Sequence, residues 1–535
     1  MNRIDALNYP YPSRRNATFG KNGMVATSQP LAAQAGLTVL QKGGNAIDAA
    51  VATAAALSVV EPTANGIGGD CFALIWHKDQ LHGLNASGPA PMSLNLEKIK
   101  GMGLNQMPKW GPLPVTIPGT PAAWAAMTER FGTQTLSDNL SQAIELASEG
   151  FPVSPSIAYS WAQQHQEFKK NFTESYFKHW FDTFASQGTP TAGQLYRLPD
   201  HARTLEMIGQ SKANAFYRGE LSKKIADFMT SIGGFVQETD LDAFQVDWCN
   251  PISVNYRGFD VWEIPPNGHG LVALLALNIL KGFEFSERDT LHTYHHQIEA
   301  IKLAYSDGFA HIAEPKSMRV RVQDLLSDEY AAIRRKLIGQ QARIPLAGTP
   351  PKGGTVYLST ADRFGNMVSM IQSNYMGFGS GLVVPGTGIA LHNRGNNFSL
   401  EEGHPNVIEP GKRPYHTIIP GFLTKNGKAI GPFGVMGGFM QPQGHVQMVM
   451  NTVDFHLNPQ AALDAPRWEW KEGNKVAIER STSDHLFYGL EGLGHEVSWN
   501  NNRVALGRGQ IIWRDSSGIL CGGTEPRTDG AVAAW

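Results

Sequence analysis

The sequence predicts an α+β protein in which helices and a sheet form layers around one shared core. Helical apolar patterns dominate before residue 350, notably over 28–62 and 140–350. After Thr355, short β-rich runs alternate with glycine turns. A polar segment rich in Pro and Gly at its end, residues 316–354, lies between them and is typical of an exposed linker. Helices, linker and sheet in this order favour a layered α+β body whose two parts share a core.

Residues 28–62 predict two consecutive helices. We expect Ser28 to cap the first helix, with Pro30 in its opening turn and Gly43-Gly44 at its end. Asn45 is expected to cap the second helix, which runs to Val60. Because this second helix is apolar on nearly every face, it must be covered on every face. Further helices are predicted over 271–280, 299–310 and 444–454.

The strand predictions begin after a glycine-rich turn at 66–69. This turn lacks the strand and helix context of a dinucleotide site, so we interpret it as a tight turn. Strands are predicted over 71–76, 355–361, 367–372, 388–392, 418–424 and 510–513.

Composition excludes several classes of function. Hydrophobic residues make up 42% and charged residues 17%, which suits a globular protein. The net charge of −2 provides no basic footprint for nucleic acid or anionic membrane. The longest apolar run, 46–60, is too short to span a bilayer. Since no apolar signal region follows Met1, we expect a cytoplasmic location.

Residue types that commonly bind metals or cofactors form no recognisable motif in this sequence. Cys71, Cys249 and Cys521 are widely separated, and the 17 histidines show no metal-ligand spacing with cysteines or acids. The sequence contains no G-x-S-x-G, Walker A or H-E-x-x-H motif. We therefore expect no metal and no cofactor.

Thr355 is the candidate nucleophile. A threonine hydroxyl needs an adjacent base, and an N-terminal threonine supplies one in its own α-amine, whose ordinary pKa is near 8. Such a residue must be released by cleavage of the preceding bond. Gly354 suits this cleavage because it lacks a Cβ and tolerates strained backbone. The alternative is that Thr355 is an ordinary strand residue.

A second glycine-rich segment, residues 434–438, follows a predicted strand. Successive glycine N–H groups at a strand end can point toward a developing oxyanion. An ordinary glycine turn is the alternative interpretation of this segment.

Taken together, the ordered motifs resemble the gamma-glutamyltranspeptidase family of N-terminal nucleophile hydrolases. The resemblance covers nearly the whole chain, and its segments are 43–52, 61–62, 66–69, 115–120, 149–153, 299–307, 362–366, 378–381, 412–414, 436–438, 464–467 and 525–527. It implies a four-layer αββα sandwich and self-cleavage between Gly354 and Thr355. The products are a large chain, 1–354, and a small chain, 355–535, which form a heterodimer with further dimerisation left open.

The resemblance also assigns roles around Thr355. Thr355 attacks an amide, an acyl-enzyme forms, and water or an acceptor amine removes the acyl group. Gly437 and Gly438 match the oxyanion donors, and Ser373 matches the hydroxyl that orients the nucleophile. The substrate is a small-molecule amide such as a γ-glutamyl compound. A periplasmic or secreted location is the alternative that the family suggests.

The residues expected to recognise the acyl group depart from the family pattern. Ser87 replaces an arginine that clamps a carboxylate, and Asn397 replaces the acidic partner of the substrate ammonium. Arg394 replaces a neighbouring glutamine, and His416 and Thr417 replace two serines. These changes predict poor use of γ-glutamyl compounds and better use of acyl groups without an ammonium, such as glutaryl. Two alternatives remain: a glutaryl or cephalosporin-type acylase, and a degenerate member that only binds a ligand.

Overall fold

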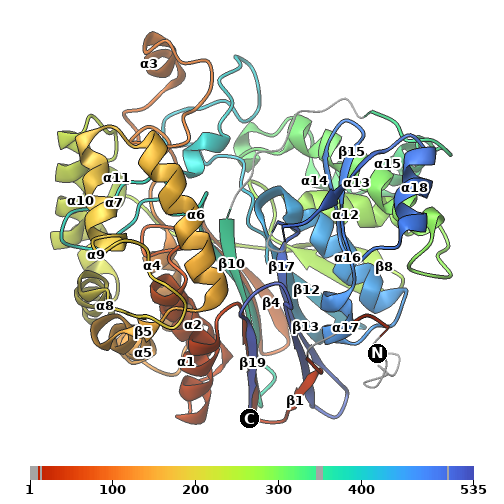
Figure 1. Cartoon of the computed structure of the whole chain (residues 1–535), viewed down its shortest axis with the longest axis horizontal. Coiled ribbons are helices and arrows are strands. Elements are labelled where there is room, and N and C mark those ends of the chain that lie inside the picture. The colour runs from red at the N-terminus through yellow and green to blue at the C-terminus, as the bar shows by residue number, and fades with distance from the viewer. Residues whose placement is uncertain (1–9, 13–14, 345–353, 503–504) are drawn as a thin grey trace.

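The computed structural model describes residues 10–12, 15–344, 354–502 and 505–535. Within them, two seven-stranded sheets and the helices beside them form the body of the protein (Figure 1). The α+β class predicted from the sequence is confirmed.

The first sheet, called the β10 sheet, contains the strand that begins next to the predicted cleavage site. Its neighbouring strands are antiparallel. In spatial order the strands are β19 (Ala531–Ala534), β2 (Gly23–Thr27), β10 (Gly354–Asp362), β11 (Met367–Tyr375), β3 (Asp70–His77), β4 (Gln80–Ala86) and β7 (Asp247–Cys249).

The second sheet, called the β13 sheet, contains the strand that leads into the second glycine-rich segment. In spatial order its strands are β1 (Thr18–Gly20), β18 (Leu520–Thr524), β17 (Arg508–Arg514), β13 (Lys428–Met436), β12 (Gly421–Lys425), β9 (Phe259–Glu263) and β8 (Ile252–Tyr256). Both sheets take strands from before and after residue 354, so the two parts of the chain are interleaved rather than side by side.

The two sheets contact each other through β10 and β13. The Tyr357 ring lies against the backbone of Gly434, where a Cβ would come within 2.4 Å of it. Tyr357, Met436 and Ile512 belong to one buried hydrophobic cluster. A glycine at 434 therefore permits the close approach that brings the end of β13 near the start of β10.

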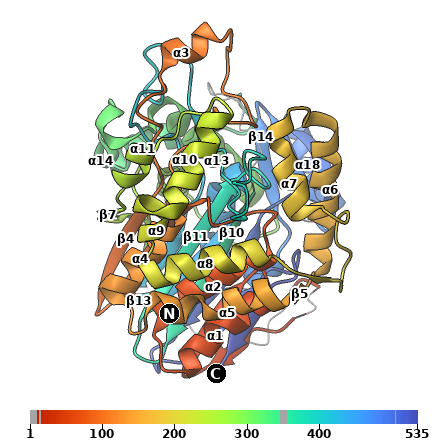
Figure 2. The ribbon, with the colours of Figure 1, turned by 90° about the vertical axis from the view of Figure 1, so that its left-hand side faces the viewer.

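Helices α1 (Pro30–Gln41) and α2 (Ala46–Val60) pack against the β10 sheet. Every residue of α2 is buried, as its all-apolar pattern predicts, and Asn45 caps it through the N–H groups of Ile47 and Asp48. The cap predicted for α1 is wrong: Gln29 occupies that position, and Ser28 donates instead to Glu61. Besides α1 and α2, this side of the molecule holds α4 (Thr120–Phe131), α5 (Leu136–Glu149) and α8 (Pro199–Ser211). Figure 2 shows these helices in front of β10 and β11.

Helices α12 (Gly270–Leu280) and α16 (Gln441–Val453) lie against the β13 sheet. The same side holds α13 (Leu291–His311), α14 (Val322–Leu325), α15 (Asp328–Arg335), α17 (Pro459–Asp464) and α18 (Asp484–Gly492). The three helices predicted over 271–280, 299–310 and 444–454 are therefore confirmed, with α13 and α16 beginning earlier than expected.

The remaining elements are peripheral. Strands β14 (Trp468–Glu472), β15 (Lys475–Glu479) and β16 (Glu496–Asn500) form a small sheet, and β5 (Phe151–Pro152) pairs with β6 (Leu195–Tyr196). The other helices are α3 (Leu96–Gly101), α6 (Pro155–Asn171), α7 (Lys178–Phe184), α9 (Asn214–Arg218), α10 (Glu220–Ser231) and α11 (Glu238–Asp242). Among the described helices, none combines the length and apolar character needed to cross a membrane.

Three predictions about local structure need correction. Residues 388–392 form no strand and make isolated bridges only, at Ala390 and Leu391. The predominantly helical region 140–350 also supplies β7, β8 and β9 to the two large sheets. The predicted linker contains α14 and α15, and Leu325 and Ala331 are buried there; its stretch 345–353 lies outside the described residues.

Candidate functional site

Thr355 lies at a local irregularity in the pairing of β10 with β11. Gly354 pairs with Tyr375 and Val356 with Gln372, so two residues of β11, Ser373 and Asn374, lie opposite Thr355 alone. This is the arrangement of a β-bulge, which re-aims side chains. Thr355 is only 1% exposed in the uncleaved chain.

The Thr355 hydroxyl contacts two polar side chains. Its Oγ1 lies 3.2 Å from Ser373 Oγ and 3.5 Å from Gln441 Nε2. Ser373 Oγ accepts the Tyr375 N–H at 2.7 Å, so its own hydrogen can be donated to Thr355 Oγ1. Ser373, predicted to orient the nucleophile, is thus brought to it, while Gln441 was not anticipated.

Gly437 and Gly438 connect β13 to a 3-10 turn, Gly438–Met440, just before α16. Their φ angles of +140° and +60° favour glycine. Within the described residues, neither N–H group has a backbone hydrogen-bond partner. Because Gln441 follows this turn and reaches Thr355, the two glycines lie within four residues of a side chain that contacts the candidate nucleophile.

Arg394 is buried and its charge is already paired. Its Nε and Nη2 donate to the two carboxylate oxygens of Asp70 at 2.7 and 3.1 Å. Its Nη1 donates to Thr417 Oγ1 at 2.7 Å, and the guanidinium lies 4.4 Å from the centre of the Tyr375 ring. Burial alone would raise the pKa of Asp70, but the Arg394 guanidinium and the His416 ring hold it well below its usual range.

His416 also contacts Asp70, and the buried His392 lies near the same oxygen, with its Nδ1 3.4 Å from Asp70 Oδ2. His416 Nε2 donates to Asp70 Oδ2 at 2.7 Å. Burial and the Arg394 charge lower the pKa of His416 to about 4, so the ring is neutral at neutral pH. Asp70, Arg394, His416 and Thr417, here called the Asp70 cluster, therefore carry no net charge, because one carboxylate balances one guanidinium.

The depressed pKa of His416 predicts a loss of stability in mild acid. Between pH 6.5 and 4 the unfolded chain binds a proton at this histidine and the folded chain does not, so folding weakens as the pH falls. When the pH falls from 7 to 5, the unfolding free energy of His416→Asn should decrease by about 2 kcal/mol less than that of the parent. Urea unfolding in the uncleaved Thr355→Ala background measures this. The exposed His485→Asn is the control, and equal decreases for His416→Asn and parent would contradict the assignment.

Asn397 and Ser87 are both tied to neighbouring groups. Asn397 accepts from the Tyr375 hydroxyl at 2.6 Å and donates to the Tyr415 carbonyl at 3.0 Å. Ser87 lies in a separate network with Asn85 and Asn267, through a 2.7 Å bond to Asn85 Oδ1 and a 3.2 Å bond from Asn267 Nδ2. The structure thus brings Arg394, His416 and Thr417 together, places Asn397 beside them through Tyr375, and leaves Ser87 in an adjacent network.

Asp70 is the most important site residue that sequence reasoning missed. It pairs with Ser373 in the register of β3 and β11, and β11 in turn pairs with β10, the strand that holds Thr355. The available signal was its position directly after the glycine-rich turn at 66–69 and directly before a predicted strand. Gly68 and Gly69 let this turn pack closely against neighbouring backbone. A Cβ on Gly68 would lie 2.4 Å from the Ala390 carbonyl oxygen, and one on Gly69 would lie 2.6 Å from the Ser373 carbonyl oxygen.

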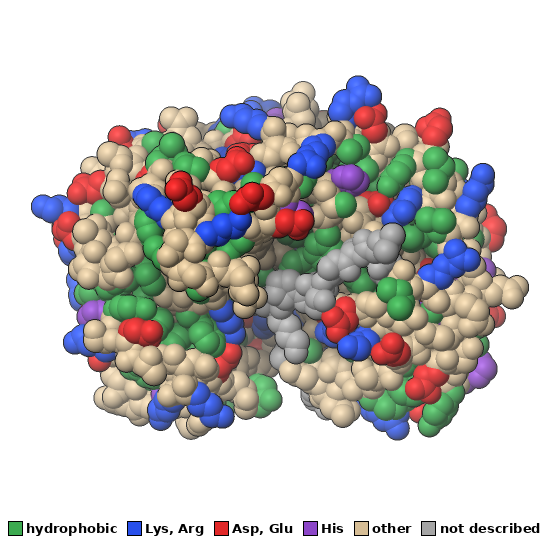
Figure 3. Space-filling model, turned by 90° about the horizontal axis from the view of Figure 1, so that it is seen from above, with side chains coloured by type: hydrophobic (Ala, Val, Ile, Leu, Met, Phe, Trp, Pro, Cys, Tyr) green, Lys and Arg blue, Asp and Glu red, His purple; other side chains and the backbone are tan. Residues whose placement is uncertain are grey.

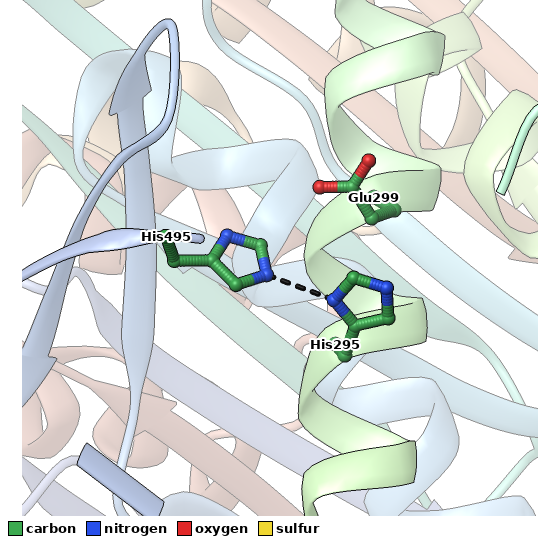
Figure 4. Close-up of side chains that lie close together, drawn as sticks. All are labelled: His295, Glu299 and His495. Atoms are coloured by element: carbon green, nitrogen blue, oxygen red, sulfur yellow. Dashed lines mark hydrogen bonds between the residues drawn. The ribbon is translucent and has the colours of Figure 1, made fainter. Parts of the chain in front are cut away.

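A second buried polar group, shown in Figure 4, lies on the α13 side of the molecule. His295, Glu299 and His495 have potential ligand atoms within 4.8 Å of one another, an arrangement that the sequence spacing did not predict. However, His295 Nδ1 and His495 Nε2 are hydrogen-bonded at 2.9 Å, and Lys302 donates to Glu299 at 2.7 Å. Because Lys302 already compensates the carboxylate, we interpret the group as a structural network.

Comparisons with known proteins found similar sequences and a similar solved structure. A model of the gamma-glutamyltranspeptidase family matches residues 32–535. The glutathione hydrolase-like YwrD proenzyme of Bacillus subtilis is 35% identical, over 96% of this chain and 99% of its own. The oxamate amidohydrolase proenzyme of Klebsiella pneumoniae is 32% identical, over 97% and 100%. The crystal structure of a cephalosporin acylase from Bacillus halodurans has a TM-score of 0.96 and 58% identity, covering 100% of this chain and 99% of the other.

Proposed function

Because the chain belongs to the gamma-glutamyltranspeptidase family, we propose that it is a self-cleaving threonine amidase and acyltransferase. It moves a γ-glutamyl or related acyl group from an amide to water or an acceptor amine. The observation that carries this proposal is Thr355 itself, which follows Gly354 at a bulge and contacts Ser373 and Gln441. Family membership and the proenzyme relatives support the same activity.

Self-cleavage is the first reaction of this proposal. Thr355 Oγ1 attacks the Gly354 carbonyl carbon, and the C–N bond to Thr355 breaks as its nitrogen gains the hydroxyl proton. Water then hydrolyses the resulting ester, leaving a carboxylate on Gly354 and a free α-amine on Thr355. The two chains, 1–354 and 355–535, remain together in this proposal, since both large sheets contain strands of each.

Acyl transfer repeats this chemistry on a substrate amide. The α-amine takes the Thr355 hydroxyl proton as Oγ1 bonds to the carbonyl carbon, and the carbonyl electron pair moves onto oxygen. The tetrahedral intermediate collapses, the C–N bond breaks, and the leaving amine receives the proton. Water or an acceptor amine then cleaves the acyl-threonine ester. In this mechanism Ser373 orients Oγ1, and the N–H groups of Gly437 and Gly438 stabilise the oxyanion.

The fold fits this proposal. We assign the arrangement to the four-layer αββα sandwich of N-terminal nucleophile hydrolases. The support is that α1 and α2 lie on one sheet, α12 and α16 lie on the other, and the sheets contact each other. On the face drawn in Figure 3, acidic and basic side chains are interspersed, which suits a small-molecule substrate better than nucleic acid.

The Asp70 cluster limits which acyl groups the proposed enzyme can bind well. Asp70 already accepts from Arg394 and His416, so it has no free charge for a substrate ammonium. Asn397 offers no charge, and Ser87 supplies no cationic clamp. An acylase acting on glutaryl or cephalosporin-type amides is therefore the second candidate, and the similarity to a cephalosporin acylase supports it.

A panel of acyl p-nitroanilides tests the choice of acyl group. We expect kcat/KM for glutaryl or butyryl anilide to exceed that for γ-glutamyl anilide at least about tenfold, because an ammonium without a counter-charge is costly to bury. Release of p-nitroaniline measures the rates. Preference for the γ-glutamyl compound would contradict the argument, and comparison of glutaryl with butyryl separates a bound carboxylate from simple apolar fit.

A further inference from the structure

Gln441 is a buried glutamine whose orientation is fixed by the backbone. It begins α16, directly after the turn that contains Gly438, and is fully buried. Its Oε1 accepts the Ile419 N–H at 3.0 Å. Because that N–H requires an acceptor, the amide oxygen must face Ile419 and the NH₂ group must face Thr355.

The contact from Gln441 to Thr355 is longer than a good hydrogen bond. Nε2 lies 3.5 Å from Oγ1, whereas N–H···O bonds centre near 2.9 Å. In the tetrahedral intermediate the oxyanion and Oγ1 are attached to the same carbon. A donor slightly too far from Oγ1 for a good hydrogen bond is therefore placed to donate to the neighbouring oxyanion. Because the charge of this oxygen develops only during attack, such a bond stabilises the transition state more than the ground state.

We propose that Gln441 Nε2 donates a hydrogen bond to the tetrahedral oxyanion, beside the N–H groups of Gly437 and Gly438. This inference rests on the proposed function of Thr355. Gln441 gives up no proton: the carbonyl electron pair moves onto oxygen during attack and returns when the C–N bond breaks. The same donor serves self-cleavage, where the oxyanion forms on the Gly354 carbonyl, and acyl transfer, where it forms on the substrate.

The support for Gln441 also links the nucleophile to the Asp70 cluster. Ile419, which orients the amide, lies two residues after Thr417, and Thr417 accepts from Arg394. The segment 417–419 therefore supports both the Asp70 cluster, through Thr417, and the Gln441 amide, through Ile419. This common support gives the donor the rigid placement that oxyanion stabilisation needs.

Two substitutions separate the donor from the rest of the side chain. Gln441→Met keeps the shape and removes the donor. Gln441→Glu keeps an acceptor for Ile419 N–H and replaces the NH₂ group by an oxygen that donates only when protonated. The matched control is Gln447→Met on the same helix. Within the part of the chain that the structure describes, the buried Gln447 side chain bonds only to the Gln443 carbonyl and to the carbonyl and N–H of Trp468.

The measurements are the rate of precursor loss after cell-free synthesis, and kcat and KM for the best anilide. We expect Gln441→Met to lower both the cleavage rate and kcat about 10²–10³-fold, with KM changed less than about threefold. Gln441→Glu should lose as much at pH 8, and its kcat relative to the parent should recover as the pH falls. Gln447→Met should keep kcat within about twofold, even if its thermal midpoint falls.

The outcomes distinguish this inference from the proposed function. Parent protein that neither cleaves nor turns over an anilide would contradict the function itself. If the parent is active, a Gln441→Met enzyme with kcat within about threefold overturns the oxyanion role. A variant that stays uncleaved but unfolds cooperatively near the parental midpoint supports it. If Gln441→Met does not fold, Gln441→Glu provides the test. Recovery of its kcat relative to the parent as the pH falls supports the oxyanion role, and the absence of this recovery overturns it.

Discussion

Replacing Thr355 by alanine is expected to leave one species of 58.3 kDa and to lower amide hydrolysis by at least about 10⁴-fold. The parent should yield two bands of about two-thirds and one-third of that mass, as cleavage before residue 355 of 535 requires. The reason is that Oγ1 is the attacking atom in both reactions, so its removal stops cleavage and turnover together. A denaturing gel and an anilide assay measure the two effects.

Two controls sharpen the Thr355 result. Thr355→Ser retains a hydroxyl and should still give two bands, more slowly. Thr360→Val alters another buried threonine of β10, whose hydroxyl donates to the Ala46 carbonyl at 2.7 Å, and should leave cleavage intact. A Thr355→Ala protein that still separates into two bands would exclude Thr355 as the nucleophile. A parent that stays as one band on long incubation would favour a non-catalytic, ligand-binding member.

Features encoded by neighbouring residues were predicted well from the sequence. Helix α2 is apolar on nearly every face and capped by Asn45, and both properties are visible in consecutive residues. The start of β10 follows a glycine and opens an apolar run, so the strand and the candidate nucleophile were found together. The α+β class follows from the same local patterns.

Features that depend on strand register were not predicted. The pairing of Ser373 with Asp70 joins residues about 300 positions apart, and no local pattern specifies it. Arg394 was consequently interpreted as a cation available to the substrate, although Asp70 neutralises it. The β8–β9 hairpin within a helical region had a local signal, the turn at Arg257-Gly258, where both φ angles are positive.

Removing the carboxylate of Asp70 is expected to cause the largest loss of stability among the site variants. Asp70→Ala leaves the Arg394 guanidinium buried without a counter-charge, and such broken buried pairs typically cost about 3–5 kcal/mol. Urea unfolding in the Thr355→Ala background measures the change. The matched control is Asp324→Ala. Arg321 donates to the Asp324 carboxylate through the same two atoms, Nε at 2.8 Å and Nη2 at 2.7 Å. Because this pair is exposed, its loss should change the unfolding free energy by a barely detectable amount.

The same substitution tests whether the pairing also sets substrate choice. In the active enzyme, Asp70→Asn keeps the size of the side chain and removes its charge, so the guanidinium of Arg394 becomes uncompensated. The ratio of glutaryl to butyryl turnover should then rise above that of the parent, because an unpaired cation favours an anionic acyl group. An unchanged ratio, together with a stability loss no greater than that of Asp324→Ala, would mean that Asp70 does not neutralise Arg394 in solution. A raised ratio would show that Asp70 neutralises Arg394 in the parent and that the pair lies close enough to the bound acyl group to influence its charge preference.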